Sequence, residues 1–205
     1  MKNRFDYDVI SIPGGPVGYD WLPEYASRLA RFKEAPIIIS GSKIQTDYLE
    51  SELFEKGVGE DLVINETELL SKYNLDEALT TIQNAYNTKR LMQAMDLGKK
   101  IAVVRADYHE RVPGEFKLIF GPGYEIIDHP VRTTISQIVK VLRMGHEKVG
   151  ILQNKAFYWT HEPRDDIGIY NIDRRIDPIM KKLQRIEGGL FGLAELVSRL
   201  SKFKE

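Results

Sequence analysis

The sequence predicts an α/β protein built on a doubly wound parallel sheet of about five strands, in the order 3-2-1-4-5, with a helical C-terminal extension. Short apolar runs alternate with longer amphipathic segments over residues 1–145. The apolar runs are rich in β-branched side chains, which is typical of parallel strands buried on both faces. Alternation at this spacing favours right-handed βαβ units, and such units build a doubly wound sheet.

In the first half of the chain, glycine, proline and small polar residues mark the ends of the expected elements. Pro36-Ile-Ile-Ile-Ser40 is a β-branched run that indicates a buried strand, and Gly57 is placed to end the second helix. We expect strands over Asp8–Ile12, Pro36–Ser40 and Leu62–Ile64, and helices over Trp21–Lys33 and about Thr46–Lys56.

The amphipathic segment Asn74–Met95 is expected to form one long helix. Asn74 can cap its start, and Glu77 stands three residues later, as in a capping box. An apolar stripe runs along it, and Gly98 follows as a stop. Beyond it we expect strands over Lys100–Val104 and Tyr124–Ile127 and a helix over Thr134–Met144.

The strand–helix alternation stops after Gly145, so we expect a core domain of residues 1–145 and an extension of residues 146–205. The extension mixes aromatic with charged side chains over residues 153–177. Its last expected helix, from Leu190 to about Phe203, has one apolar face. The extension therefore either packs on the core or forms a homodimer.

Composition excludes several classes of protein. The formal net charge of −1 gives no general attraction to nucleic acid. Cysteine is absent, which excludes disulfides, thiolate catalysis and thiolate-ligated metal centres. No apolar run approaches the roughly 18–20 residues that span a bilayer. We therefore expect a cytoplasmic protein whose partner is a small molecule, without contact to a membrane.

The predicted strand order places a site where the winding direction reverses, between the first and fourth strands. Ligands of such sheets bind beyond the carboxyl ends of the strands at this reversal. The loop after the first strand offers Gly14 and Gly15, whose backbone N–H groups can approach an anionic or nucleotide ligand. A tight turn is the other explanation. Ser40-Gly41-Ser42 ends the second strand in the same way, and either holds phosphate or ribose or only caps a turn.

The loop after the fourth strand, Arg105–Arg111, is the densest polar segment of the chain. The imidazole of His109, with an ordinary pKa of about 6.5, suits proton transfer near neutrality. Asp107 is a neighbouring carboxylate, and Arg105 and Arg111 can bind an anion. A solvated turn would also account for these residue types.

Polar residues also follow one stripe of the expected long helix. Thr81, Asn84 and Thr88 recur at spacings of three and four residues, offset from the apolar face. They form either an exposed edge or part of the site. No close spacing of His, Asp and Glu resembles a metal motif, so no metal site is expected.

Five short motifs, each present once, follow one another over residues 7–128. They are Pro13-Gly-Gly15, Ala35-Pro-Ile-Ile-Ile-Ser-Gly41, Glu66 after the third strand, Thr80-Thr-Ile-Gln-Asn-Ala85 and Val103-Val-Arg-Ala-Asp-Tyr-His109. Their types and order resemble the YdcF/SanA/ElyC-like family of Rossmann-like proteins. The resemblance implies a polar, charged site of enzymatic character and a nucleotide-like ligand such as S-adenosylmethionine. It implies site roles for Gly14, Gly15, Ser40, Gly41, Glu66, Thr81, Asn84, His109 and Arg111.

Three functions fit these observations. The first is an enzyme of the hydrolase or transferase type acting on a small anionic or nucleotide-containing substrate. In it His109 is the general acid/base, Glu66 or Asp107 orients it, and Gly14, Gly15, Ser40 and Gly41 bind the anion through backbone donors. The second is a non-catalytic binder or sensor of a nucleotide-like metabolite. The third is a scaffold protein that uses the aromatic extension and the last helix.

Overall fold

The computed structural model describes residues 6–14, 20–75, 77–78 and 80–133. The chain divides into two compact units, Met1–Asp107 with Val112–Arg132, and Tyr108–Arg111 with Thr133–Glu205. The helices and strands given below all belong to the first unit. The helix expected over Thr134–Met144 and the extension expected over 146–205 lie outside the described residues.

The first unit contains a five-stranded sheet in the order β3-β2-β1-β4-β5, and every neighbouring pair is parallel. This confirms the predicted strand order and the doubly wound, Rossmann-like α/β fold. The strands are β1 (Val9–Pro13), β2 (Ile37–Ser40), β3 (Val63–Asn65), β4 (Lys100–Ala106) and β5 (Glu125–Val131). The helices are α1 (Trp21–Lys33), α2 (Lys43–Glu55), α3 (Glu66–Tyr73), α4 (Thr81–Ala94) and α5 (Val112–Phe120), with a 3-10 turn at Glu60–Leu62.

The central strands are buried on both faces, as their β-branched composition predicts. All five residues of β1 and all four of β2 are buried. Ile10 and Ile12 of β1 and Ile37 and Ile39 of β2 join apolar side chains of α1 and α2 in one core cluster. Each such side chain contributes roughly 2 kcal/mol by leaving water. The core therefore fixes the registers of β1 and β2, which place their carboxyl ends side by side.

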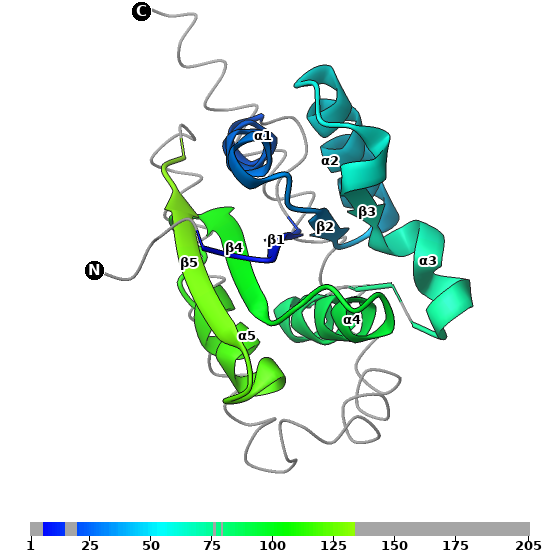
Figure 1. Ribbon diagram of the computed structural model, residues 1–205, viewed down its shortest axis with the longest axis vertical. Coiled ribbons are helices and arrows are strands. Elements are labelled where there is room, and N and C mark those ends of the chain that lie inside the picture. Colours follow the sequence, from blue (N-terminus) through cyan, green and yellow to red (C-terminus); the bar gives the residue numbers. More distant parts are fainter. Residues whose placement is uncertain (1–5, 15–19, 76, 79, 134–205) are drawn as a thin grey trace, which may run out of the picture. The chain divides into compact units, whose positions relative to one another are not determined.

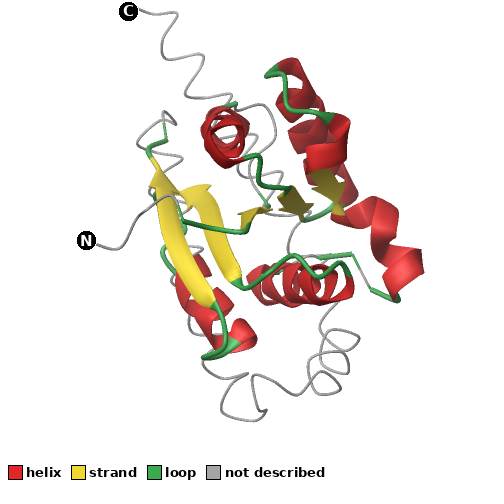
Figure 2. Cartoon of the chain, viewed as in Figure 1, coloured by secondary structure: helices red, strands yellow, loops and turns green. Residues whose placement is uncertain are grey.

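Helices cover both faces of the sheet. Figure 1 shows α1 and α2 on one face and α4 and α5 on the other. Figure 2 shows the same layers by type of structure, with the strands between two helical layers. The chain changes face after β3, when α4 crosses back over β2 and β1 to deliver β4 next to β1. The winding reversal thus lies between β1 and β4.

The expected long helix over Asn74–Met95 is wrong, because only its second part, Thr81–Ala94, is helical and the residues before it separate α4 from the preceding helix α3. Helix α3 ends at Tyr73, and Asn74 is its C-cap in the left-handed conformation, with φ of 53°. Helix α4 begins after Thr80, whose hydroxyl oxygen accepts a hydrogen bond from the Gln83 backbone N–H at 3.2 Å. The Thr80 backbone N–H donates back to the Gln83 side chain at 2.8 Å. This capping box starts the helix seven residues later than predicted.

Further differences concern the second half of the sheet. Helix α5, with Pro113 in its first turn, was not expected between the last two strands. Strands β4 and β5 extend two and four residues further than predicted, to Ala106 and Val131. Helix α1 has the predicted bounds. Among the described residues no helix is long and apolar enough to cross a membrane.

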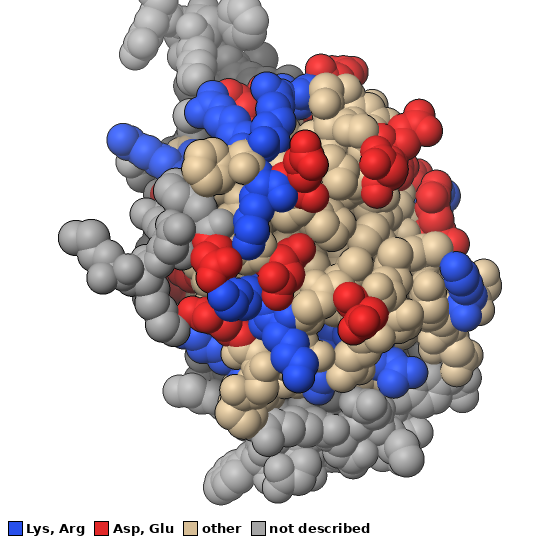
Figure 3. All heavy atoms as spheres, in the orientation of Figure 1, with Lys and Arg blue, Asp and Glu red and all other residues tan. Residues whose placement is uncertain are grey.

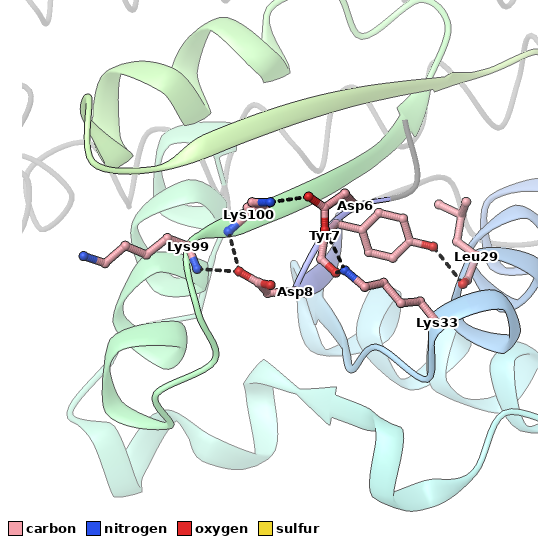
Figure 4. A network of polar contacts seen from close by, with 7 residues as sticks. All are labelled: Asp6, Tyr7, Asp8, Leu29, Lys33, Lys99 and Lys100. Carbon is pink, nitrogen blue, oxygen red and sulfur yellow. Dashed lines mark hydrogen bonds and ion pairs between the residues drawn. The ribbon is translucent and has the colours of Figure 1, made fainter. Parts of the chain in front are cut away.

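A network of charged residues joins β1 to β4 at the amino edge of the sheet (Figure 4). The Asp8 carboxylate accepts hydrogen bonds from the backbone N–H groups of Lys99 and Lys100, at 2.8 and 2.9 Å. The Asp6 carboxylate pairs with Lys100 and, at 3.2 Å, with Lys33 of α1. The ion pairs with Asp6 lower the pKa of its carboxyl group. This edge therefore serves to hold strands together, and the opposite, carboxyl edge is available for other roles.

Candidate functional site

Four buried polar side chains meet at the carboxyl edge of the sheet. Ser40 ends β2, Glu66 follows β3 directly, and Asn84 and Asn87 lie one turn apart on α4. The Ser40 hydroxyl donates to Asn84 Oδ1 at 2.9 Å, and Asn87 Nδ2 donates to Glu66 Oε1 at 2.7 Å. We call these four residues the carboxyl-edge cluster. Three elements distant in sequence thus bring their polar groups to one place.

Glu66 is the most perturbed member of the cluster. Its side chain is fully buried, and this burial raises the pKa of its carboxyl group to about 8. The Ser40 hydroxyl, the Asn87 amide and the Ala78 backbone lie close enough to offset part of this rise. Oε2 nevertheless makes no hydrogen bond of ordinary geometry within the described residues. At neutral pH Glu66 is therefore mostly a neutral acid. Its Oε1 is the acceptor of the hydrogen bond from Asn87, which fits a carbonyl oxygen there and the acidic proton on Oε2.

Exposure divides the cluster into an inner and an outer part. Ser40 and Glu66 are 0% exposed, whereas Asn87 and Asn84 retain 3% and 7% of their surface; Thr81, which precedes them on α4, retains 8%. Only the outer residues can touch a ligand, so Ser40 and Glu66 can act only through them. Thr88 is also fully buried, so the interpretation of Thr81, Asn84 and Thr88 as an exposed edge is wrong.

Two glycines allow the ends of β1 and β2 to approach the cluster closely. Gly14 has φ of 71°, and a Cβ atom there would lie 3.6 Å from Asn84 Nδ2. Gly41 has φ of 149°, and its Cβ would lie 2.8 Å from Gln45 Oε1 and 3.3 Å from the Gly14 Cα. A side chain at either position would strain the backbone, and at Gly41 it would also collide with Gln45. Glycine is thus required for the two strand ends to pack beside α4.

The backbone N–H of Gly14 already has partners. It donates to the carbonyl oxygens of Ile12 and Ser40. These hydrogen bonds must break before the N–H can donate to an anion. Ser42 is the N-cap of α2, where its backbone N–H and hydroxyl both donate to Gln45 Oε1, at 3.1 and 3.2 Å. Gly15 lies outside the described residues.

On the other side of the reversal, Arg105 is engaged within the sheet. Its guanidinium donates to both carboxylate oxygens of Asp128 on β5, each at 2.8 Å. It also donates to the carbonyl oxygens of Ala106 and Asp107, at 3.0 and 3.3 Å. The backbone N–H of Asp107 donates to the Val131 carbonyl. Arg105 therefore holds together the carboxyl ends of β4 and β5, and two of its guanidinium nitrogens are directed at the Asp128 carboxylate.

His109 and Arg111 follow β4 in the chain and belong to the second unit. Within that unit the ring of His109 stands edge-on to the ring of Tyr108, with 4.4 Å between the centroids. The meeting of His109 with Gly14 stays a prediction.

Two members of the site were not singled out from the sequence. Asn87 was missed although it stands three residues after Asn84, the spacing that places both on one helix face. Gln45 was missed although it lies only four residues after Gly41; its closeness to Gly14 depends on the fold. The helical spacing could have found Asn87, and the capping-box pattern Ser42-x-x-Gln45 could have found Gln45.

Charge is distributed unevenly over the described surface. On the face seen in Figure 3, basic side chains gather over α1 and acidic ones over α2. The carboxyl-edge cluster itself contains one titratable group, Glu66, and no basic residue. Within the described part of the chain, no three His, Cys, Asp or Glu side chains are grouped to hold a metal ion.

Comparison with known proteins does not assign this chain to a family. No protein family model matches the chain, and no curated protein matches it either.

Proposed function

We propose that the chain binds a small anionic or nucleotide-containing ligand at the carboxyl edge of its sheet, beside Gly14 and Asn84. The observation that carries this proposal is the carboxyl-edge cluster, which combines close backbone approach with polar groups that water does not reach. A buried polar group costs stability when it is unsatisfied, as Glu66 Oε2 is, and a functional role is one explanation for keeping it. The position beyond the strand ends, at a winding reversal, is where ligands of this fold class bind.

We propose further that the protein is an enzyme of the hydrolase or transferase type, with His109 as general acid/base. The imidazole would take a proton from the attacking group and return it to the leaving group. Support for this role comes from the order of the chain. His109 follows β4 by three residues, and β4 is one of the two strands between which the winding reverses. The resemblance to YdcF/SanA/ElyC-like proteins supports a nucleotide-like ligand, S-adenosylmethionine among them, and a cytoplasmic location belongs to the same proposal.

A binding test separates the site from the reaction. Melting temperatures are measured with adenosine, AMP, ATP and S-adenosylmethionine at up to 100 times their apparent Kd. A ligand that binds only the folded state adds about 2.7 kcal/mol at this excess, a rise of roughly 5–10 °C for a protein of this size. Asn84→Ala should abolish the rise, whereas Gln93→Ala, an exposed position of the same helix, should preserve it. No rise with any of these ligands would count against the site.

A turnover test addresses catalysis. Product formation from the ligand that stabilises the protein is followed in the native chain and in His109→Ala. We expect turnover to be lost in the variant with little change in melting temperature, because an imidazole beside a turn contributes to chemistry more than to packing. Retained turnover would remove His109 from the mechanism. Binding without any product in the native chain would favour the non-catalytic sensor.

A further inference from the structure

Two buried hydroxyl groups outside the carboxyl-edge cluster make no hydrogen bond within the described part of the chain. They are Ser11 Oγ on β1 and Thr88 Oγ1 on α4. Both side chains are fully buried. A hydroxyl can donate one hydrogen bond and accept others, and burying it without any of them costs stability. These two groups therefore require a partner that no described residue supplies.

Both hydroxyls belong to the contact between α4 and the sheet. Ile10 and Ile12 point into the core cluster that includes side chains of α1 and α2, and side chains alternate along a strand, so Ser11 points to the opposite face. Figure 1 shows α4 on that opposite face. Thr88 follows Asn84 by one turn on the buried side of α4.

The Ser40–Asn84 hydrogen bond sets the register between α4 and this face. Ser40 ends β2, and its hydroxyl donates to Asn84 Oδ1 at 2.9 Å. Two residues earlier on β2, about 6.6 Å away, is Ile38, whose Cα partner on β1 is Ser11. Four residues later on α4, about 6 Å away, is Thr88. Because α4 runs from the carboxyl edge back to the amino edge, the two steps have the same direction, and Thr88 comes to lie over the row that contains Ser11.

This row leaves room between the sheet and the helix. On the α4 face, Ser11 stands between Ile38 of β2 and Val103 of β4, its Cα partners on either side. The serine side chain is shorter than both, so the layer is thinnest at its centre. Ala85, three residues before Thr88 on the same side of α4, is also small and is fully buried. A space of this kind holds water when polar groups line it and stays dry when they do not.

We propose that an internal water molecule bridges Ser11 Oγ and Thr88 Oγ1 and thereby joins β1 to α4. Internal waters typically make about three hydrogen bonds. The backbone carbonyl oxygen of Asn84, one turn before Thr88, has a second lone pair to offer as the third partner. The water site lies on the helix that carries Asn84 and Asn87 to the carboxyl edge, so it helps to place that cluster. It does not depend on the proposed function.

Removing the hydroxyls singly and together in the full chain tests the bridge. Ser11→Ala and Thr88→Val delete the oxygen with little change of shape. If water joins the two oxygens, each single variant leaves it with one partner fewer and should melt about 2–4 °C lower. The double variant has a dry apolar contact and should recover most of this loss, because replacing both polar partners is nearly neutral. Ser51→Ala, an exposed change on α2, is the control and should keep the native melting temperature.

Magnetic relaxation dispersion of ¹⁷O detects long-lived internal water and does not respond to hydroxyl groups. The native chain should show a contribution that the double variant lacks, and Ser51→Ala should retain it.

Three results would overturn the bridge. Single variants that melt at or above the native temperature would mean that the hydroxyls stand unsatisfied in a dry contact. Losses that add up in the double variant would mean that each hydroxyl has a partner of its own. Equal ¹⁷O dispersion in the native chain and the double variant would mean that no water is bound between Ser11 and Thr88.

Discussion

The carboxyl group of Glu66 lies where water does not reach, and its charge state is set by the fold. Asn65 caps α3 and Glu66 is the first residue of that helix, so the backbone turns at this point and carries the side chain inward. A helix N-terminus favours negative charge, yet burial outweighs this effect and the pKa rises. Such a group links the stability of the fold to pH.

We expect Glu66→Gln to flatten the dependence of stability on pH. The folded pKa of about 8 lies above the ordinary value of 4.5, so between these pH values the folded chain holds a proton that the unfolded chain has released. Stability from this group is therefore greatest below pH 4.5 and declines as the pH rises to 8, by at most about 1.4 kcal/mol per pH unit. Glutamine has no such proton.

Urea unfolding at pH 5, 6, 7 and 8 measures this effect. Glu68→Gln, an exposed change on the same helix, is the control and should keep the slope of the native chain. Equal slopes for the native chain and Glu66→Gln would mean that Glu66 is ionised throughout.

The sequence predicted residues of this site better than it predicted their partners. Ser40 and Asn84 could be singled out because strand ends and helix spacing mark them in any βα unit, whereas Glu66 was singled out by the family resemblance alone. That Ser40 contacts Asn84, and Glu66 contacts Asn87, depends on α4 crossing β2. Such contacts join residues 44 and 21 positions apart, and no local pattern encodes them.

At the scale of elements, the segment between β3 and β4 shows how caps decide where helices begin. Apolar periodicity runs through residues 74–95 and favours one helix, and both Asn74 and Thr80 satisfy the rule for an N-cap. The structure uses Thr80 to start α4 and Asn74 to end α3. Helix α5 was hidden for a related reason, because Pro113 indicates a break unless it lies in a first turn.

The two-helix arrangement predicts an order of stability for variants of Asn74. Its left-handed φ of 53° is accessible to glycine without strain but costs alanine about 1 kcal/mol. Asn74→Gly should therefore be about as stable as the native chain, and Asn74→Ala less stable by about that amount. Thermal unfolding compares the three proteins. An alanine variant more stable than the glycine variant would fit a helix that continues through residue 74.

At the scale of the whole molecule, the strand order could be predicted because few topologies satisfy right-handed crossovers and two covered faces. The amino-edge network could not, since Asp8 and the two amides that it binds are 91 and 92 residues apart. This network and the carboxyl-edge cluster lie at opposite ends of the strands. Substitutions at the amino edge should therefore change stability and leave ligand binding intact.

Gly98→Ala tests the join between β1 and β4. Gly98 has φ of 82°, and a Cβ there would lie 2.4 Å from Asp8 Oδ2, so alanine would strain the backbone and displace the carboxylate from the two amides. We expect a loss of about 2 kcal/mol, the sum of a strained residue and weakened hydrogen bonds. Gly123→Ala, where nothing lies within 4 Å of the added atom, is the control. Equal melting temperatures for the two variants would show that the Asp8 contacts contribute nothing.

The central place of β1 has a consequence for synthesis on the ribosome. One side of β1 pairs with β2, which follows soon after it, but the other side must wait for β4. At roughly 5–20 residues per second, translation leaves that side open for several seconds to almost twenty. An apolar strand with an unpaired edge invites association with other chains. Shielding of this edge until β4 emerges would therefore reduce association, and slower elongation would lengthen the exposure.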